Sequence, residues 1–286
     1  MTATLAAPTR PRLAVPAIRW WALLRFLVCA LVVVMMLAPL AIVIIISFSS
    51  APFLSFPPPG FSLQWYEKFF GSAAWLDALA TTVKVMIPVS LLATALGTMA
   101  ALGIARGRAP FATALGGLLM APLVVPVIIT AAAIFGAFRA WGLHGTLLGL
   151  ILAHTVLTLP FVLSTVLASL RMVDRSLENA ALTLGATPWH VFWRITFPLI
   201  LPGVVSGLLF ALVMSFDELV VSLFISTPSL RPITVEMWSD VRGAVDPTIT
   251  AISTSLFLFS LLLLLTESLA RRRLRARRPD SPEMVF

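Results

Sequence analysis

Long apolar runs alternate with short polar segments along almost the whole chain. Six windows carry no charged residue: 26–66, 85–105, 109–138, 140–170, 195–216 and 247–266. Each window is at least as long as the ~20 residues that an α-helix needs to cross about 30 Å of hydrocarbon. The pattern therefore predicts six membrane-spanning helices, near residues 24–48, 77–105, 112–137, 146–170, 199–225 and 247–269.

A polar segment, residues 171–198, separates the fourth and fifth predicted spans and carries signals of helix boundaries. Asp174 or Ser176 is suited to be an N-cap, and Gly185 interrupts the helical pattern. Thr187 then provides a second N-cap, with Pro188 at the first helical position, where a missing N–H costs nothing. We expect two short helices joined at Gly185 in a left-handed or otherwise tight conformation. Such a loop is suited to bind another protein.

Arginine and lysine are distributed unequally between the two sides of these spans. One side receives four arginines before the first span, two at 106–108, three in loop 171–198 and six after the last span, whereas the other side receives four cations. The positive-inside rule therefore predicts that loop 171–198 and both termini are cytoplasmic. The chain then divides into a cytoplasmic segment 1–23, a six-span transmembrane domain 24–270 that includes loop 171–198, and a cytoplasmic basic tail 271–286, which we expect to contact anionic membrane lipid.

Composition agrees with a membrane protein and excludes several function classes. Hydrophobic residues make up 59% and charged residues 11% of the chain, against roughly 25% charged in soluble domains. The net charge of +8 arises from cations that flank spans, so it indicates topology and no nucleic-acid partner. The first apolar run exceeds the length of a cleavable signal peptide, so we expect a retained helix.

Candidate catalytic chemistry is sparse. The chain lacks the G-x-x-x-x-G-K-[ST] phosphate-binding motif, and Cys29 is its single cysteine, so neither an intrachain disulfide nor a cysteine-built metal site is possible. His144, His154 and His190 fall in an outer loop, a span and the polar loop, which favours structural roles. We expect no catalytic residue, no metal site and no cofactor on this chain.

The polar loop has a recognisable motif. ENAALTLGA at residues 178–186, followed by ITFPLILPG at 195–203, resembles the EAA loop of permease subunits of binding-protein-dependent ABC importers. In that family the loop docks into a cleft of a separate cytoplasmic ATPase. The family's first acidic residue falls here on Asn179, so its role is lost or has moved to Glu178. The resemblance implies an ATPase-coupling site at Glu178, Asn179, Ala180, Ala181, Leu184, Gly185 and Ala186.

Three further segments, 47–70, 215–226 and 233–256, are similar to spermidine/putrescine importer permeases of the C type. The resemblance implies an all-α type I ABC importer permease fold with six transmembrane helices in the bacterial inner membrane. It also implies four kinds of partner: a second homologous permease, a cytoplasmic ATPase dimer that uses ATP and magnesium, a periplasmic substrate-binding protein and membrane lipid. The expected solute is a polyamine or another cationic or amine-bearing compound.

Two adjacent carboxylates in the predicted fifth span are the candidate pathway residues. Ionised groups within a span mark a pathway or a buried pair, and neighbouring helical residues point about 100° apart. Glu218 shares a stripe of small and hydroxyl side chains with Ser215 and Ser222, which either lines a pathway for a cation or permits close helix packing. Asp217 points to an apolar side and is predicted to pair with Lys84, unless Lys84 snorkels to the outer interface.

Two other function classes remain as alternatives. An ion-gradient-driven secondary transporter would act without an ATPase, but such proteins often show inverted repeats, and the sequence shows no convincing internal repeat. A membrane receptor or scaffold would leave the EAA-type loop unexplained. Prolines that are expected to bend the spans lie at positions 39, 88, 122, 126, 160 and 202.

Overall fold

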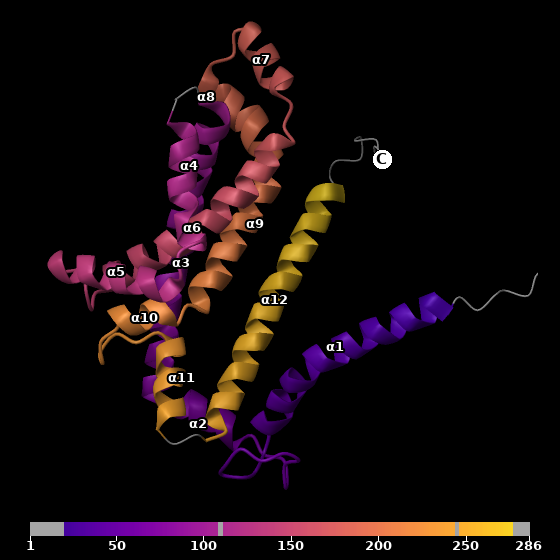
Figure 1. Ribbon diagram of the computed structural model, residues 1–286, viewed down its shortest axis with the longest axis vertical. Coiled ribbons are helices and arrows are strands. Elements are labelled where there is room, and N and C mark those ends of the chain that lie inside the picture. Colours follow the sequence, from indigo (N-terminus) through magenta and orange to yellow (C-terminus); the bar gives the residue numbers. More distant parts are fainter. Residues whose placement is uncertain (1–19, 108–110, 244–245, 277–286) are drawn as a thin grey trace, which may run out of the picture.

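The computed structural model describes residues 20–107, 111–243 and 246–276 and is built from helices (Figure 1). Within these ranges the only β-type pairings are isolated bridges, Ser49 with Phe61 and Thr227 with Leu230. The α-helices are α1 (Trp20–Ser47), α2 (Gln64–Gly71), α3 (Ala73–Arg106), α4 (Ala112–Met120), α5 (Val127–Ala140), α6 (Leu147–Arg171), α7 (Arg175–Thr183), α8 (Pro188–Val191), α9 (Phe197–Phe216), α10 (Val220–Ile225), α11 (Ile233–Arg242) and α12 (Thr248–Ala276). Short turns η1 (Ala121–Leu123) and η2 (Phe192–Thr196), the second π-helical, complete the list.

The predicted N-terminal segment and basic tail fall almost wholly outside the described residues. Residues 1–19 and 277–286 are not described, and neither are the side chains of 271–276. The division of the chain at residues 23 and 270, and the contact of the tail with lipid, therefore stay predictions.

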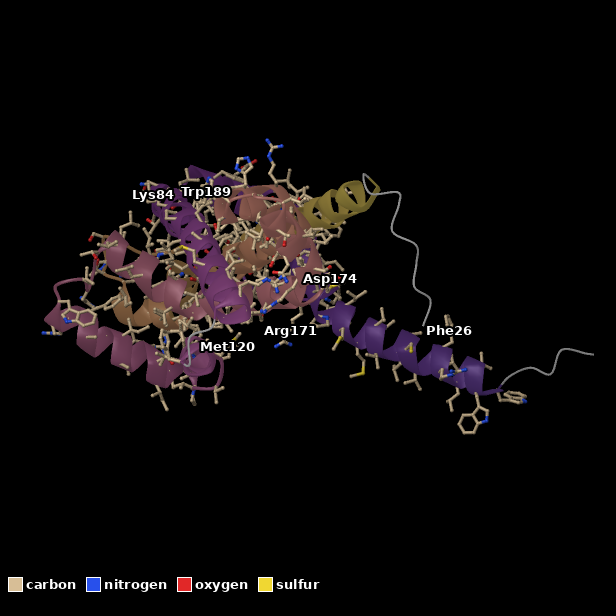
Figure 2. All side chains as sticks on the ribbon, turned by 90° about the horizontal axis from the view of Figure 1, so that it is seen from above. Phe26, Lys84, Met120, Arg171, Asp174 and Trp189 are labelled. Atoms are coloured by element: carbon tan, nitrogen blue, oxygen red, sulfur yellow. The ribbon has the colours of Figure 1, made fainter. Side chains whose placement is uncertain are left out.

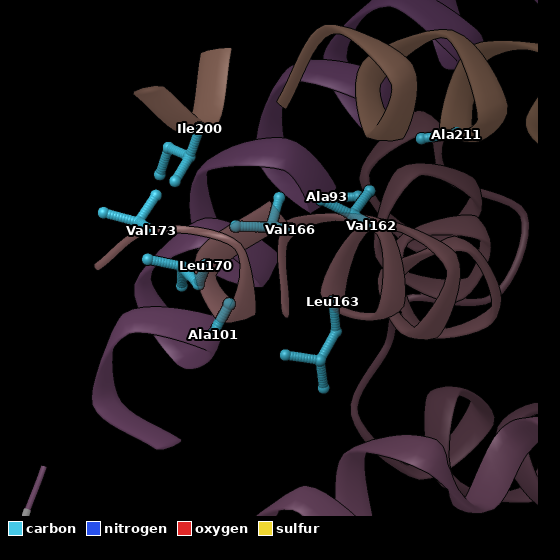
Figure 3. Close-up of a cluster of buried hydrophobic side chains, with 9 residues drawn as sticks. All are labelled: Ala93, Ala101, Val162, Leu163, Val166, Leu170, Val173, Ile200 and Ala211. Atoms are coloured by element: carbon cyan, nitrogen blue, oxygen red, sulfur yellow. The ribbon is translucent and has the colours of Figure 1, made fainter. Parts of the chain in front are cut away.

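Helices α3, α6 and α9 pack together as the centre of the molecule (Figure 1). Small residues allow this close approach. A side chain at Gly207 of α9 would place its Cβ 2.8 Å from Thr165 Oγ1 and 3.0 Å from Val162 Cγ1, both on α6. Around this contact lies a cluster of buried apolar side chains (Figure 3): Ala93, Ala101, Val162, Leu163, Val166, Leu170, Val173, Ile200 and Ala211. Because lipid tails are as apolar as these side chains, dense packing is the main stabilising contribution between such helices.

Helix α1 diverges from this centre. The C-terminal end of α1 lies near α12, and the N-terminal part of α1 extends away from the other helices (Figure 1). Phe26 on α1 lies well apart from the body of the molecule (Figure 2), and the most apolar window of this helix has no buried residue. Its outward side chains are thus free to contact lipid or another subunit.

The predicted third span is broken. In place of one helix over residues 112–137, the chain forms α4 with η1 and then α5, bent by 106°. Pro122 lies in η1 and Pro126 caps α5. Proline lacks a donor for the helical ladder and restricts the residue before it, so two prolines four residues apart end the first helix and begin a second in a new direction.

The predicted fifth span, 199–225, is also wrong as a single helix. Helix α9 ends at Phe216 with Asp217 as its C-cap, and α10 begins at Val220. Overall, four described helices are long and apolar enough to cross a membrane, or five if the bent pair forms one span. The apolar part of α12, Thr248–Leu262, is shorter. The number of six spans therefore stays a prediction.

The two ends of the bundle differ. Helices α7 and α8 project at one end, and α2 and α11 cover the other (Figure 1). At the second end the Trp65 Nε1–H donates to Ser49 O at 2.7 Å, and Lys68 pairs with Asp246. Burial raises the pKa of Asp246, but the Lys68 ammonium and the hydrogen bonds from Thr248 outweigh it, so this pKa lies below its usual value. The first contact ties α2 to the segment after α1, and the second ties α2 to the start of α12.

Candidate functional site

The polar loop folds as its sequence predicts. The backbone N–H of Ser176 donates to Asp174 Oδ1 at 2.8 Å, which makes Asp174, not Ser176, the N-cap of α7. The same hydrogen bond lowers the pKa of the Asp174 carboxyl. Gly185 ends α7 with φ +88, in the left-handed region that favours glycine. Thr187 caps α8, accepting from the His190 N–H at 3.4 Å, with Pro188 first in the helix.

Glu178 anchors this loop to the helical bundle. Its Oε2 lies 3.0 Å from Arg106 Nε at the end of α3, an ionic contact that lacks the alignment of a hydrogen bond. Its Oε1 accepts from the Thr196 hydroxyl at 2.8 Å. Arg175 reinforces the junction by donating to Ala105 O. Nothing in the local sequence indicates these partners, because Arg106 lies on a different span.

The opposite face of the loop is exposed and apolar. Leu184 is 88% and Leu177 is 50% exposed, although both are large hydrophobic residues. Asn179 and Ala180 are exposed as well, whereas Glu178 is only partly so. The loop therefore holds its carboxylate against the bundle and presents leucines outward, as expected of a surface that a second protein covers.

A cavity of about 670 Å³ lies between the end of α9, α11 and α12. Its volume falls within the roughly 300–1,000 Å³ typical of small-molecule sites. Its lining includes the exposed acidic residue Asp217 together with the aromatic residues Phe216, Trp238 and Phe257. An exposed carboxylate beside aromatic faces is an arrangement that attracts organic cations.

The predicted roles of Glu218 and its stripe need correction. Because the helix ends before Glu218, Ser215 and Ser222 lie on two different helices. The Glu218 Oε1 accepts from the Val221 N–H at 2.9 Å and so caps α10. Ser215 and Ser222 are buried against His154 of α6, at 3.0 and 2.9 Å. The two serines therefore contribute to packing between helices, the alternative that the sequence left open, and Asp217 is the acidic residue that lines the cavity, whereas a pathway role of Glu218 stays a prediction.

The predicted pair of Lys84 and Asp217 is also wrong. In the part of the chain that the structure describes, no ion pair joins these residues, and both side chains are exposed. Lys84 lies on α3 (Figure 2), which does not line the cavity. Asp217 consequently keeps its carboxylate accessible, while the snorkelling of Lys84 stays a prediction.

The three histidines lie apart, as the sequence indicates. His144 packs edge-on against Phe135, with ring centroids 5.2 Å apart, and His190 is exposed at α8. His154 is buried between α6, α9 and α10. Its two hydroxyl partners, Ser215 and Ser222, are 61 and 68 residues away, so its central place was not visible in the sequence.

The sequence of this chain matches a family of membrane proteins. The model of binding-protein-dependent transport system inner membrane components matches residues 93–275. The putrescine transport system permease protein PotI of Escherichia coli strain K12 is 34% identical over 224 residues, covering 76% of this chain and 79% of that protein. The spermidine/putrescine transport system permease protein PotC of Haemophilus influenzae is 32% identical over 214 residues, covering 75% and 83%.

The fold has matching solved structures. The crystal structure of a bacterial ABC transporter involved in the import of the acidic polysaccharide alginate superposes with a TM-score of 0.67. It is 12% identical and covers 93% of this chain and 99% of that one. At this identity the likeness shows the fold alone.

The chain belongs to the family of binding-protein-dependent transport system inner membrane components. It is a multi-pass permease subunit of an ABC importer, a transport protein and not an enzyme, which works with an ATPase and a periplasmic binding protein. This membership favours the importer over the gradient-driven transporter and over the receptor or scaffold.

Proposed function

We propose that this permease imports a polyamine or a related amine-bearing cation, and that Asp217 binds the cationic group during passage. The observation that carries the proposal is the cavity at the end of α9, where an accessible carboxylate stands beside three aromatic rings. Charge and aromatic faces together select an organic cation over a neutral or anionic solute. The PotI and PotC relatives, named for putrescine and spermidine transport, support the same class of solute.

The coupling part of the proposal rests on the polar loop. Helix α7 and its C-cap residue present Leu177 and Leu184 outward for the cleft of a cytoplasmic ATPase, while Glu178 and Arg175 transmit the movement of the helix to the end of α3. ATP and magnesium bind to that partner. The loop and both termini then face the cytoplasm, as the positive-inside rule requires. A second permease, homologous to this chain, completes the pathway and covers apolar helix surface.

The test is uptake of radiolabelled putrescine and spermidine by the complete importer in ATP-loaded proteoliposomes. Asp217→Asn preserves size and removes the charge. A charge-assisted hydrogen bond contributes about 1.5–3 kcal/mol, so the half-saturation concentration should rise about 10- to 150-fold. Asp77→Asn, at an exposed carboxylate on α3 away from the cavity, is the matched control and should change little.

Two results would contradict this function. Equal half-saturation concentrations for the Asp217→Asn importer and the unmodified one would show that the cavity does not bind the cation. Uptake without ATP, driven by a proton or sodium gradient through this chain alone, would establish the secondary transporter instead.

A further inference from the structure

His154 occupies the junction of the three helices that surround the break in the fifth span. It projects from α6 and is 1% exposed. Its Nδ1 lies 3.0 Å from Ser215 Oγ, two residues before Asp217, and its Nε2 lies 2.9 Å from Ser222 Oγ on α10. One imidazole thus bridges the two helices on either side of the break.

The single hydrogen of the Ser222 hydroxyl determines which atoms of this bridge donate and which accept. The Ser222 hydroxyl donates its single hydrogen to Glu218 O at 2.8 Å, since a carbonyl can only accept. Toward His154, Ser222 Oγ must therefore accept, so Nε2 carries a proton. An unpaired charge is costly in such a buried place, which leaves the imidazole neutral and Nδ1 as an acceptor for the Ser215 hydroxyl.

The chain of hydrogen bonds runs from Ser215 through His154 and Ser222 to Glu218 O. The same carbonyl accepts a second hydrogen bond, from Thr234 Oγ1 of α11 at 3.2 Å. Thr234 and Asp217 both line the cavity. The carbonyl of Glu218, the residue next to Asp217, is therefore held through Ser222 by His154 of α6 on one side and directly by Thr234 of α11 on the other.

We propose that His154 is a positioning residue for solute binding: it fixes the break between α9 and α10 so that Asp217 faces the cavity. The role in solute binding rests on the proposed function of Asp217. The imidazole itself does not line the cavity, so it acts through the two serines and the Glu218 peptide. A break without proline or glycine at residues 216–219 needs such external support, because its own sequence does not enforce it.

Matched substitutions separate the two arms of the bridge. The amide nitrogen of His154→Gln reaches the place of Nε2 and can donate to Ser222, whereas His154→Leu fills the volume and donates nothing. The uptake assay should give a half-saturation concentration within about threefold of normal for Gln and about tenfold higher for Leu, with similar maximal rates. Thr158→Val, which removes a buried hydroxyl bonded only within α6, is the control and should leave both constants unchanged.

Two measurements test the hydrogen bonds of His154 and the stability of the break between α9 and α10 independently of transport. Nitrogen-15 spectra of histidine-labelled protein should show Nε2 protonated and Nδ1 not, and the reverse would overturn the chain of hydrogen bonds. Hydrogen exchange at the Val221 N–H should quicken in the Leu variant and recover in the Gln variant. Unchanged exchange in the Leu variant would overturn the positioning role.

The transport and exchange results together distinguish the two proposals. Faster exchange with a raised half-saturation concentration supports both. Faster exchange with normal uptake would overturn the positioning role of His154 in solute binding, whereas the binding role of Asp217 is decided separately by the Asp217→Asn importer. Equal loss of folded protein in the Gln and Leu variants, with normal half-saturation in what remains, would reduce His154 to a structural residue.

Discussion

Glu178 anchors the polar loop to the helical bundle, and this contact leads to a prediction about Glu178. The family motif alone would assign the same role to position 179. Glu178→Gln preserves the size of the side chain and a partner for Thr196, but it removes the charge that faces Arg106. We expect this change to loosen α7 from the bundle and to weaken coupling to the ATPase. Asn179→Asp, which restores an acid at the family's position, should have little effect because that side chain is exposed.

The magnitude follows from burial and distance. The side chains of Arg106 and Glu178 are 21% and 13% exposed, and the charged atoms lie 3.0 Å apart. Removing one partner of a fully buried pair costs about 3–5 kcal/mol, whereas a solvent-exposed pair contributes about 0.2–1 kcal/mol. A mostly buried pair at the edge of the bundle falls between, so we expect Glu178→Gln to destabilise the loop by about 1–3 kcal/mol.

The assay is solute-stimulated ATP hydrolysis by the purified importer, together with hydrogen exchange of the α7 amides. Glu178→Gln should quicken exchange in α7 and lower the stimulated rate, while Asn179→Asp stays within about 0.5 kcal/mol of the original in stability. Adding Arg106→Gln to Glu178→Gln should recover part of the loss, because the unpaired cation is removed. Normal coupling in Glu178→Gln combined with a large change in Asn179→Asp would refute the anchoring role.

Two other outcomes are expected from the loop and the break. Gly185→Val should reduce ATPase association and uptake without preventing membrane insertion, because a left-handed residue with a Cβ costs about 1–2 kcal/mol. Gly185→Asn is the control and should retain more activity. Equal activity of the two variants would argue against backbone strain. Glu218→Gln should lower the thermal stability of the complex by weakening the cap on α10, with a half-saturation concentration near normal, and a shift in half-saturation as large as that of Asp217→Asn would return Glu218 to the pathway.

Local chemistry determined much of this protein from the sequence alone. Uninterrupted apolar windows require burial in hydrocarbon, which placed α1, α3 and α6 within a few residues of their observed bounds. The loop was predictable because caps act within four residues: Asp174 and Thr187 bond backbone N–H groups beside them, and Gly185 supplies its own φ.

Only the tertiary structure decided where the charged side chains point. The window around Phe216 reads as one continuous helix, yet α9 ends there, and bonds from other helices flank the break: Thr234 of α11 donates to Glu218 O, and His154 of α6 contacts Ser215 and Ser222. Once that helix ends, a helical wheel no longer applies, and the carboxylate facing the cavity is Asp217. Such bonds join residues far apart in sequence, so their energy depends on which helices lie side by side, and no local pattern encodes that.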